Sequence, residues 1–226
     1  MNLENILTIS FFILSIVIVS YAQFKISSAY SKYKKISNTK KLSGSEVARM
    51  ILDANGLENI YVIETTGELT DHYDPTRKVI KLSKDIFHGE TIASLSVAAH
   101  ECGHAIQDKE NYSFMRIRTM IVPVVNLVSY LGYFSIIIGA LAGATGYLLI
   151  GIITLMATIL FQLVTLPVEF DASNRAKKEL KKLNLIDDEE GVSSMLSAAA
   201  FTYVASLIST LLNLLRLILM FSKRDE

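Results

Sequence analysis

The chain has 226 residues, of which 51% are hydrophobic and only 19% are charged. Its 22 Lys and Arg residues balance 22 Asp and Glu residues, so the formal net charge is zero and no nucleic-acid partner is expected. The mean hydropathy of +0.39 is too high for an ordinary soluble domain, which predicts a membrane protein. The single cysteine, Cys102, excludes an intrachain disulfide and a thiolate metal cage, so any metal must be bound by His and carboxylate side chains.

The first apolar segment, residues 5–24, carries no charge and is long enough to cross the ~30 Å hydrocarbon layer once as a helix. Its end, Ser20-Tyr21-Ala22, resembles a signal-peptidase site, which would make the segment a cleaved signal peptide. The residues before it include Glu4 and no Lys or Arg, the reverse of a secretory signal. A retained transmembrane anchor is therefore favoured.

A long uncharged region, residues 119–168, lies between Arg118 and Glu169. Two membrane crossings and a turn would account for its length, so a transmembrane hairpin is predicted. Small residues mark the turn: Gly139, Ala140, Ala142, Gly143, Ala144 and Gly146. Residues 191–222 are expected to form a fourth apolar helix. It either spans the bilayer fully or lies partly in its interface, and the Ser, Ala and Thr residues of its first half favour the second arrangement.

Positive charge is distributed unevenly along the chain. Residues 25–118 and 169–190 together hold 19 of the 22 Lys and Arg residues. Positive charge close to membrane-spanning helices favours the cytoplasmic side. The sequence therefore predicts a multi-pass protein of the cell membrane, with its N-terminus outside and both polar segments facing the cytoplasm.

The first polar segment, residues 25–118, is long enough for a small α+β domain. Ser43-Gly44-Ser45-Glu46 fits a capping box and begins a short amphipathic helix. Residues 60–65 and 78–83 are strand-like and separated by turn-forming residues, so we expect them to pair in a small antiparallel sheet. A further helix is predicted from Thr91 to about Asp108.

The predicted fold is a mainly α membrane protein with about four transmembrane or apolar helices and a small cytoplasmic α+β domain. Its five segments are a transmembrane anchor (5–24), a cytoplasmic α+β domain (25–118), a transmembrane hairpin (119–168), a cytoplasmic segment (169–190) and a C-terminal apolar helix (191–222).

Residues 100–104 are His-Glu-Cys-Gly-His, an H-E-x-x-H motif in the last predicted helix of the α+β domain. His side chains at i and i+4 lie one turn apart on one helix face, where both can bind one Zn²⁺ at about 2.0–2.1 Å. Glu101, beside the first His, can accept a proton from a zinc-bound water. Cys102 points to the opposite face and is expected to pack in the core rather than bind metal. Because the chain has only four His residues, an accidental match is rare.

A catalytic zinc needs a third protein ligand and an open position. Glu169 is the favoured candidate, because the uncharged hairpin returns the chain to the membrane surface where the His helix lies. His72 and His88 are the other histidines. From spacing alone, Glu169 could equally be a carboxylate that caps the end of a transmembrane helix.

Two stretches, residues 99–107 (AHECGHAIQ) and 166–176 (LPVEFDASNRA), resemble the YugP-type bacterial membrane zinc metallopeptidases, a group of neutral zinc metallopeptidases. The resemblance extends over nearly the whole chain and includes residues 70–75 and 198–205. More distantly, the chain is similar to the HtpX-type gluzincins, which also place a membrane hairpin between the His helix and a ligand glutamate.

The resemblance implies a zincin-like catalytic domain and a metal centre with one Zn²⁺ per chain. His100, His104 and Glu169 would be the zinc ligands, and Glu101 would be the general base.

One position departs from the HtpX pattern, in which an Asp four residues after the ligand Glu orients a ligand His. Here that position is Ser173, which shares a helix face with Glu169 and could supply a weaker hydrogen bond to a His ligand. Asp171 lies about 200° round a helix from Glu169 and is expected to face elsewhere.

Three further side chains have weaker claims to a role in the site. His72 and Tyr203 could each donate a hydrogen bond to the oxyanion, although local hydrogen bonds are the commoner arrangement. Arg175 could pair with a carboxylate of the site. It could also belong, with the lysines at 177, 178, 181 and 182, to a solvated basic face that contacts anionic lipid headgroups.

The leading hypothesis is a membrane-embedded zinc endopeptidase at the cytoplasmic surface, acting on proteins or peptides, unfolded and membrane proteins among them. Residues 78–83 are expected to offer a sheet edge to which an extended substrate adds as a further strand.

The main alternative is a catalytically silent zinc-bound membrane scaffold or regulatory protein, in which the Glu101 carboxylate would have no role. A transporter or channel is a third hypothesis, prompted by Asn126, Gln162 and Asn213, although such amides more often join helices.

Overall fold

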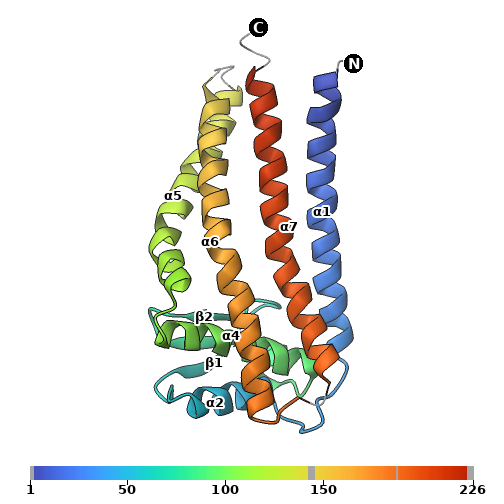
Figure 1. Ribbon diagram of the computed structural model, residues 1–226, viewed down its shortest axis with the longest axis vertical. Coiled ribbons are helices and arrows are strands. Elements are labelled where there is room, and N and C mark those ends of the chain that lie inside the picture. Colours follow the sequence, from blue (N-terminus) through green and yellow to red (C-terminus); the bar gives the residue numbers. More distant parts are fainter. Residues whose placement is uncertain (1–2, 142–145, 187, 223–226) are drawn as a thin grey trace. The chain divides into compact units, whose positions relative to one another are not determined.

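The computed structural model describes residues 3–141, 146–186 and 188–222. In this part of the chain the fold is mainly helical, as predicted, with one small sheet (Figure 1). The elements in chain order are α1 (Leu3–Tyr33), α2 (Gly44–Ala54), β1 (Tyr61–Thr65), β2 (His72–Asp74), β3 (Val79–Ser83), α3 (Lys84–His88), α4 (Ile92–Lys109), α5 (Ser113–Leu141), α6 (Tyr147–Lys182) and α7 (Glu189–Ser222). The predicted hairpin turn falls largely on residues 142–145, which lie outside the described residues.

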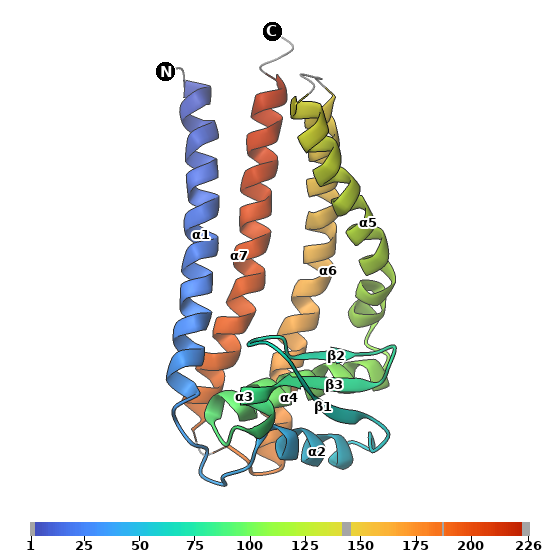
Figure 2. The same cartoon turned by 180° about the vertical axis from the view of Figure 1, so that it is seen from behind.

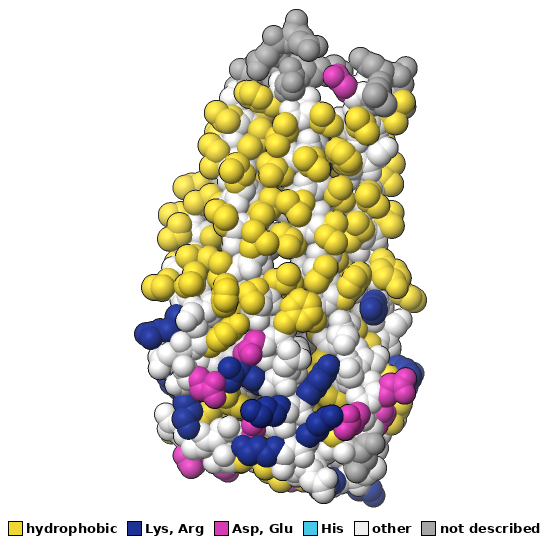
Figure 3. All heavy atoms as spheres, viewed as in Figure 1, with side chains coloured by type: hydrophobic (Ala, Val, Ile, Leu, Met, Phe, Trp, Pro, Cys, Tyr) yellow, Lys and Arg dark blue, Asp and Glu magenta, His cyan; other side chains and the backbone are white. Residues whose placement is uncertain are grey.

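The chain divides into two compact units. The first consists of Met1–Gln23, Ile117–Leu166 and Thr202–Glu226, and the second of Phe24–Arg116 and Pro167–Phe201. Among the described residues, four helices contain segments long and apolar enough to cross a membrane, namely α1, α5, α6 and α7, which confirms the expectation of about four. Hydrophobic side chains cover the visible surface of the first unit, whereas Lys, Arg, Asp and Glu gather over the second (Figure 3).

Within the first unit, one amide links two apolar helices. Gln162 Nε2 of α6 donates to Ser206 Oγ at 2.9 Å and to Thr210 Oγ1 at 3.0 Å, both on α7. Asn213 Nδ2 instead donates to the backbone oxygen of Ser209, one turn earlier in its own helix. Gln162 therefore has the helix-joining contacts that are common for amides in membrane helices.

The amphipathic helix α2 begins where the sequence predicts. The side chain of Ser43 accepts from the backbone N–H of Glu46, and the Glu46 carboxylate accepts from the backbone N–H of Ser43. Two N–H groups that the first helical turn leaves without partners are thereby satisfied. The helix buries its apolar face, which consists of Val47, Ala48, Ile51 and Leu52.

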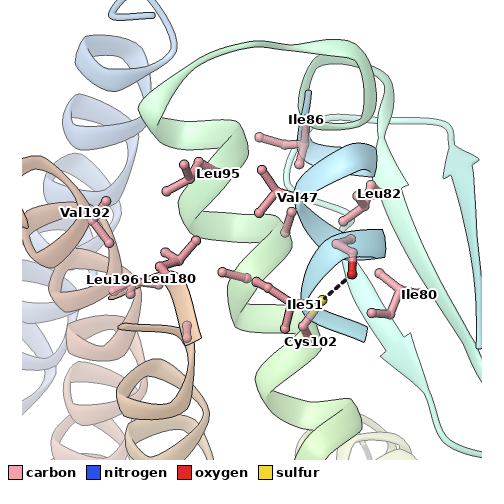
Figure 4. Close-up of a cluster of buried hydrophobic side chains, with 14 of the residues drawn as sticks. Val47, Ile51, Ile80, Leu82, Ile86, Leu95, Cys102, Leu180, Val192 and Leu196 are labelled. Carbon is pink, nitrogen blue, oxygen red and sulfur yellow. Dashed lines mark hydrogen bonds between the residues drawn. The ribbon is translucent and has the colours of Figure 1, made fainter. Parts of the chain in front are cut away.

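Buried side chains of α2, β3, α4, α6 and α7 form the core of the second unit (Figure 4). Cys102 of α4 is fully buried, and its Sγ donates to the backbone oxygen of Ala48 at 3.6 Å. The expectation that Cys102 packs in the core is confirmed. This core holds α4 against α2 on one side and against the residue 167–182 part of α6 on another, as Figure 4 shows.

The small sheet has the strand order β1-β3-β2, with β3 in the middle (Figure 2). β1 pairs with β3 in parallel and β2 pairs with β3 antiparallel, so the predicted antiparallel pairing of the two longer strands is wrong. The connection between them is no simple turn, because it contains β2, which takes the antiparallel place beside β3. The expectation that residues 78–83 offer a free edge is also wrong, since both edges of β3 are paired.

Candidate metal centre

Helix α4 carries the H-E-x-x-H motif. The side chain of Thr91 accepts from the backbone N–H of Ser94 and so caps the first turn of the helix. Regular helix continues to Lys109, so His100 and His104 lie on one face, with ring centroids 4.8 Å apart and ring planes at 82°.

Glycine in the motif allows α6 to approach this face closely. A Cβ atom at Gly103 would lie 2.5 Å from the backbone oxygen of Ala172, a contact that real Cβ atoms do not make. Only glycine therefore fits between the two helices here. Ala172 is three residues after Glu169, so the close approach brings the Glu169 side chain to the His pair.

The structure brings together the three residues predicted to bind metal. Glu169 Oε2 lies 3.3 Å from His100 Nε2 and 3.6 Å from His104 Nε2, and the candidate ligand atoms all lie within 4.8 Å of one another. A tetrahedral ion with bonds of about 2.0–2.1 Å has ligands roughly 3.4 Å apart. These spacings and the His/His/Glu donor set fit a zinc ion.

The site is largely shielded from solvent. The side chains of His100, His104 and Glu169 are 14%, 8% and 2% exposed. A buried carboxylate normally needs a charged partner or a metal. In this structure the Glu169 carboxylate has two His rings beside it, at 3.3 Å and 3.6 Å.

Glu101 is also buried, with 6% of its surface exposed. Burial is the main cause that raises the pKa of the Glu101 carboxyl to about 7. The negative charges of Glu169 and Asp71 raise this pKa further. The charge of His100 and a backbone hydrogen bond from Tyr73 of β2 act in the opposite direction and lower it. A carboxyl with a pKa near neutrality can both accept and release a proton at physiological pH.

Each His ring has a second hydrogen-bond partner. His100 Nδ1 lies 3.2 Å from Ser173 Oγ, which confirms the expected contact from Ser173. His104 Nδ1 lies 3.0 Å from Gln107 Oε1. Gln107 in turn donates to Asp171, which contacts the His104 ring only through this amide and not directly. The angle round α6 does separate Asp171 from Glu169, but the long Gln107 side chain bridges that separation.

His72, His88 and Arg175 have partners other than the residues of this cluster. His72 is exposed in β2, and its Nδ1 lies 2.8 Å from the backbone oxygen of Thr70. His88 pairs with Glu64 at 2.7 Å. Arg175 binds Asp171 and Glu110 rather than a carboxylate of the His/His/Glu cluster. Tyr203 lies in α7.

Sequence reasoning missed two contributors, Gln107 and Tyr73. Gln107 is three residues after His104, a spacing that makes side chains neighbours on a helix, so its contact could have been anticipated. No comparable signal exists for Tyr73, since its backbone meets Glu101 only through the tertiary fold.

The chain matches known proteins over almost its whole length. The profile of a family described as "Putative neutral zinc metallopeptidase" matches residues 8–222. The "Putative membrane protease YugP" of Bacillus subtilis (strain 168) is 45% identical over 209 residues, which are 91% of this chain and 93% of that protein. No solved structure matches the chain.

Proposed function

The chain belongs to the neutral zinc metallopeptidase family, as its resemblance to YugP-type proteins predicts, and from this premise we propose that it is a membrane-embedded zinc endopeptidase. One observation carries the proposal: both His Nε2 atoms and Glu169 Oε2 converge beside the buried Glu101. This combination supplies a metal site and a base in one place.

In this proposal His100, His104 and Glu169 bind one Zn²⁺ per chain. When bound, Zn²⁺ polarises the scissile carbonyl and lowers the pKa of a water toward ~7. Glu101 accepts the proton of the attacking water and delivers it to the leaving amine. Its raised pKa suits both transfers, because neither protonation state is strongly disfavoured near neutral pH.

A silent zinc-bound scaffold would account for the metal site but not for Glu101. A structural zinc site normally closes with a fourth protein ligand. Within the described parts of the chain, the candidate metal group consists of three residues, which leaves a position for water or substrate. Burying a carboxyl beside this group costs free energy without a structural return, which favours catalysis.

The substrates that follow from a peptidase are proteins or peptides, and we propose unfolded and membrane proteins among them. The bilayer is the second partner, because four helices can cross it. We place the metal centre on the cytoplasmic side, since the second unit carries most of the positive charge. A reporter fused after Lys41 should therefore be accessible only from the cytoplasm, and labelling from outside intact cells would reverse this topology.

The test of function compares wild-type protein, Glu101→Gln and the exposed control Glu90→Gln, all purified in detergent. Degradation of an unfolded test protein and bound zinc are measured in the same samples. We expect the wild type and Glu90→Gln to cleave, and Glu101→Gln to retain zinc without cleaving. Equal cleavage by Glu101→Gln would remove Glu101 as the base, and zinc binding without cleavage by the wild type would favour the scaffold.

A further inference from the structure

Hydrogen bonds connect His104 of α4 to Asp171 of α6 through a single buried side chain. His104 Nδ1 lies 3.0 Å from Gln107 Oε1. Gln107 Nε2 donates to the backbone oxygen of Val168 and to Asp171 Oδ2, at 2.8 Å in each case. Gln107 is 0% exposed, so its amide group is shielded from solvent and bonds to these protein groups.

The partners of Gln107 determine which way its amide points. A backbone oxygen and a carboxylate can only accept hydrogen bonds. The NH₂ group of Gln107 therefore faces Val168 and Asp171, and its oxygen faces His104. The opposite amide orientation would place the Gln107 oxygen against two acceptors, inside a buried site where such a loss is costly.

The orientation of the Gln107 amide fixes the tautomer of His104. An amide oxygen can only accept, so Nδ1 of a neutral His104 ring carries the proton. Its Nε2 atom then has the free lone pair, and this is the atom that lies 3.6 Å from Glu169 Oε2. The His104 ring is thus set in advance to bind metal through Nε2.

His100 is not constrained in the same way. Its Nδ1 faces the Ser173 hydroxyl at 3.2 Å, and a hydroxyl can donate or accept. Ser173 therefore orients the ring of His100 without selecting a tautomer. The two ligand histidines differ in how completely the fold prepares them.

An ion pair holds the outer end of this connection. The Asp171 side chain is 31% exposed and accepts from Arg175, which also donates to Glu110. The Arg175 guanidinium lies 5.9 Å from the centre of the Tyr112 ring. These contacts orient the Asp171 carboxylate so that Oδ2 faces Gln107.

We propose that Gln107 and Asp171 are positioning residues that hold His104 as its Nδ1–H tautomer and thereby raise the affinity of the centre for zinc. Asp171 acts through Gln107, because the Gln107 side chain links the two residues by a hydrogen bond to each. The inference rests on the proposed zinc site and adds to it the residues that prepare one ligand.

Zinc affinity tests the proposal. Competition with a chromogenic chelator measures the dissociation constant of zinc for full-length detergent-purified protein. The variants are Gln107→Met, which keeps the side-chain size, Asp171→Ala, the double variant, and the exposed control Asn174→Ala on the same helix. Removing such an outer partner typically weakens metal binding about 10- to 100-fold.

We expect Gln107→Met to weaken zinc binding within that range, Asp171→Ala to weaken it less, and Asn174→Ala to leave it unchanged. Because Asp171 acts through Gln107, adding Asp171→Ala to Gln107→Met should cause no further loss. Unchanged affinity in Gln107→Met, or fully additive losses in the double variant, would overturn the proposal.

A second measurement reads the tautomer directly. With ¹⁵N-labelled histidine only four residues contribute signals, and His104→Gln identifies the one from His104. In zinc-free wild type we expect the Nδ1–H pattern for His104, and in folded Gln107→Met a mixture with Nε2–H. An Nε2–H ring in the wild type would overturn the proposal.

The two experiments also separate this inference from the proposed function. If the wild type binds no zinc, the proposed function fails, and the NMR measurement still decides the tautomer. If the wild type binds zinc and Gln107→Met binds it equally well, the zinc site stands and the positioning role is wrong.

Discussion

Gly103 and the backbone oxygen of Ala172 are close enough that a Cβ atom on the glycine would lie 2.5 Å from the oxygen. Backbone meets backbone at this point, one residue before His104 and three residues after Glu169. The distance between the two helices, and hence the size of the proposed zinc site, depends on a residue that contributes no side chain.

Replacing Gly103 with alanine should therefore damage both stability and metal binding. Overpacking of this kind costs about 1–3 kcal/mol, because backbone atoms of α6 must move away. We expect a lower unfolding temperature and weaker zinc binding in Gly103→Ala. Gly146→Ala is the control, since a Cβ there meets nothing within 4 Å. Similar behaviour of the two variants would contradict the close-packing argument.

Zinc should stabilise the folded protein. A ligand that binds only the folded state adds about 2.7 kcal/mol when its free concentration is 100 times the dissociation constant. Chelation should lower the unfolding temperature of the wild type, and zinc addition should restore it. In His100→Ala the temperature should respond much less to either treatment, and an equal response would place the stabilising metal elsewhere.

The capping box of α2 should make a stability contribution that depends on pH. Hydrogen bonds from the side chain and backbone of Ser43 lower the pKa of Glu46 from its ordinary value of 4.5. Because the folded state has the lower pKa, this contribution is complete above pH 4.5 and disappears as the pH falls through the folded-state pKa. Ser43→Ala should cost about 1 kcal/mol at neutral pH.

The measurement is chemical unfolding of wild type and Ser43→Ala, at neutral pH and at pH values below 4.5. The difference in unfolding free energy should shrink in acid. Glu46→Gln should lose part of this pH dependence, whereas Glu58→Gln, which changes an exposed carboxyl outside α2, should keep it. A difference that stays constant with pH would show that Glu46 does not contribute as a carboxylate.

The Gln162 contact should stabilise the pairing of α6 and α7 within the first unit. Hydrogen bonds between membrane helices average about 0.6 kcal/mol. Gln162→Leu should lower the unfolding free energy in detergent by an amount of this order, and Thr210→Val should have a smaller effect in the Gln162→Leu background than alone. Asn213→Leu is the control, because Asn213 bonds to its own helix. Additive effects of Gln162→Leu and Thr210→Val would mean that these residues do not interact.

The elements that the sequence predicted well are those encoded by local patterns. Uncharged length located the apolar helices, the Ser43–Glu46 spacing located the start of α2, and the H-E-x-x-H motif fell on α4. The sheet was harder, because β2 has only three residues and its last, Asp74, precedes a proline and so resembles a turn. Without β2, the pairing of the longer strands could not be assigned.

The candidate site shows the same division between local and tertiary information. His100, Glu101 and His104 follow from one motif, and the Ser173 contact follows from the face that it shares with Glu169. The role of Asp171 could not be read from helix angles, since it depends on Gln107 reaching from α4 to α6. Contacts of this kind depend on how closely two helices approach, a distance that no spacing within one helix encodes.

Glu169 is 69 residues later in the sequence than His100, and most of the uncharged stretch between them belongs to the apolar helices α5 and α6. During translation, the His helix is therefore synthesised well before Glu169, the proposed third ligand. We expect the nascent chain to hold zinc weakly until this hydrophobic stretch has been made and inserted into the bilayer. Assembly of the proposed zinc site would then be coupled to membrane integration.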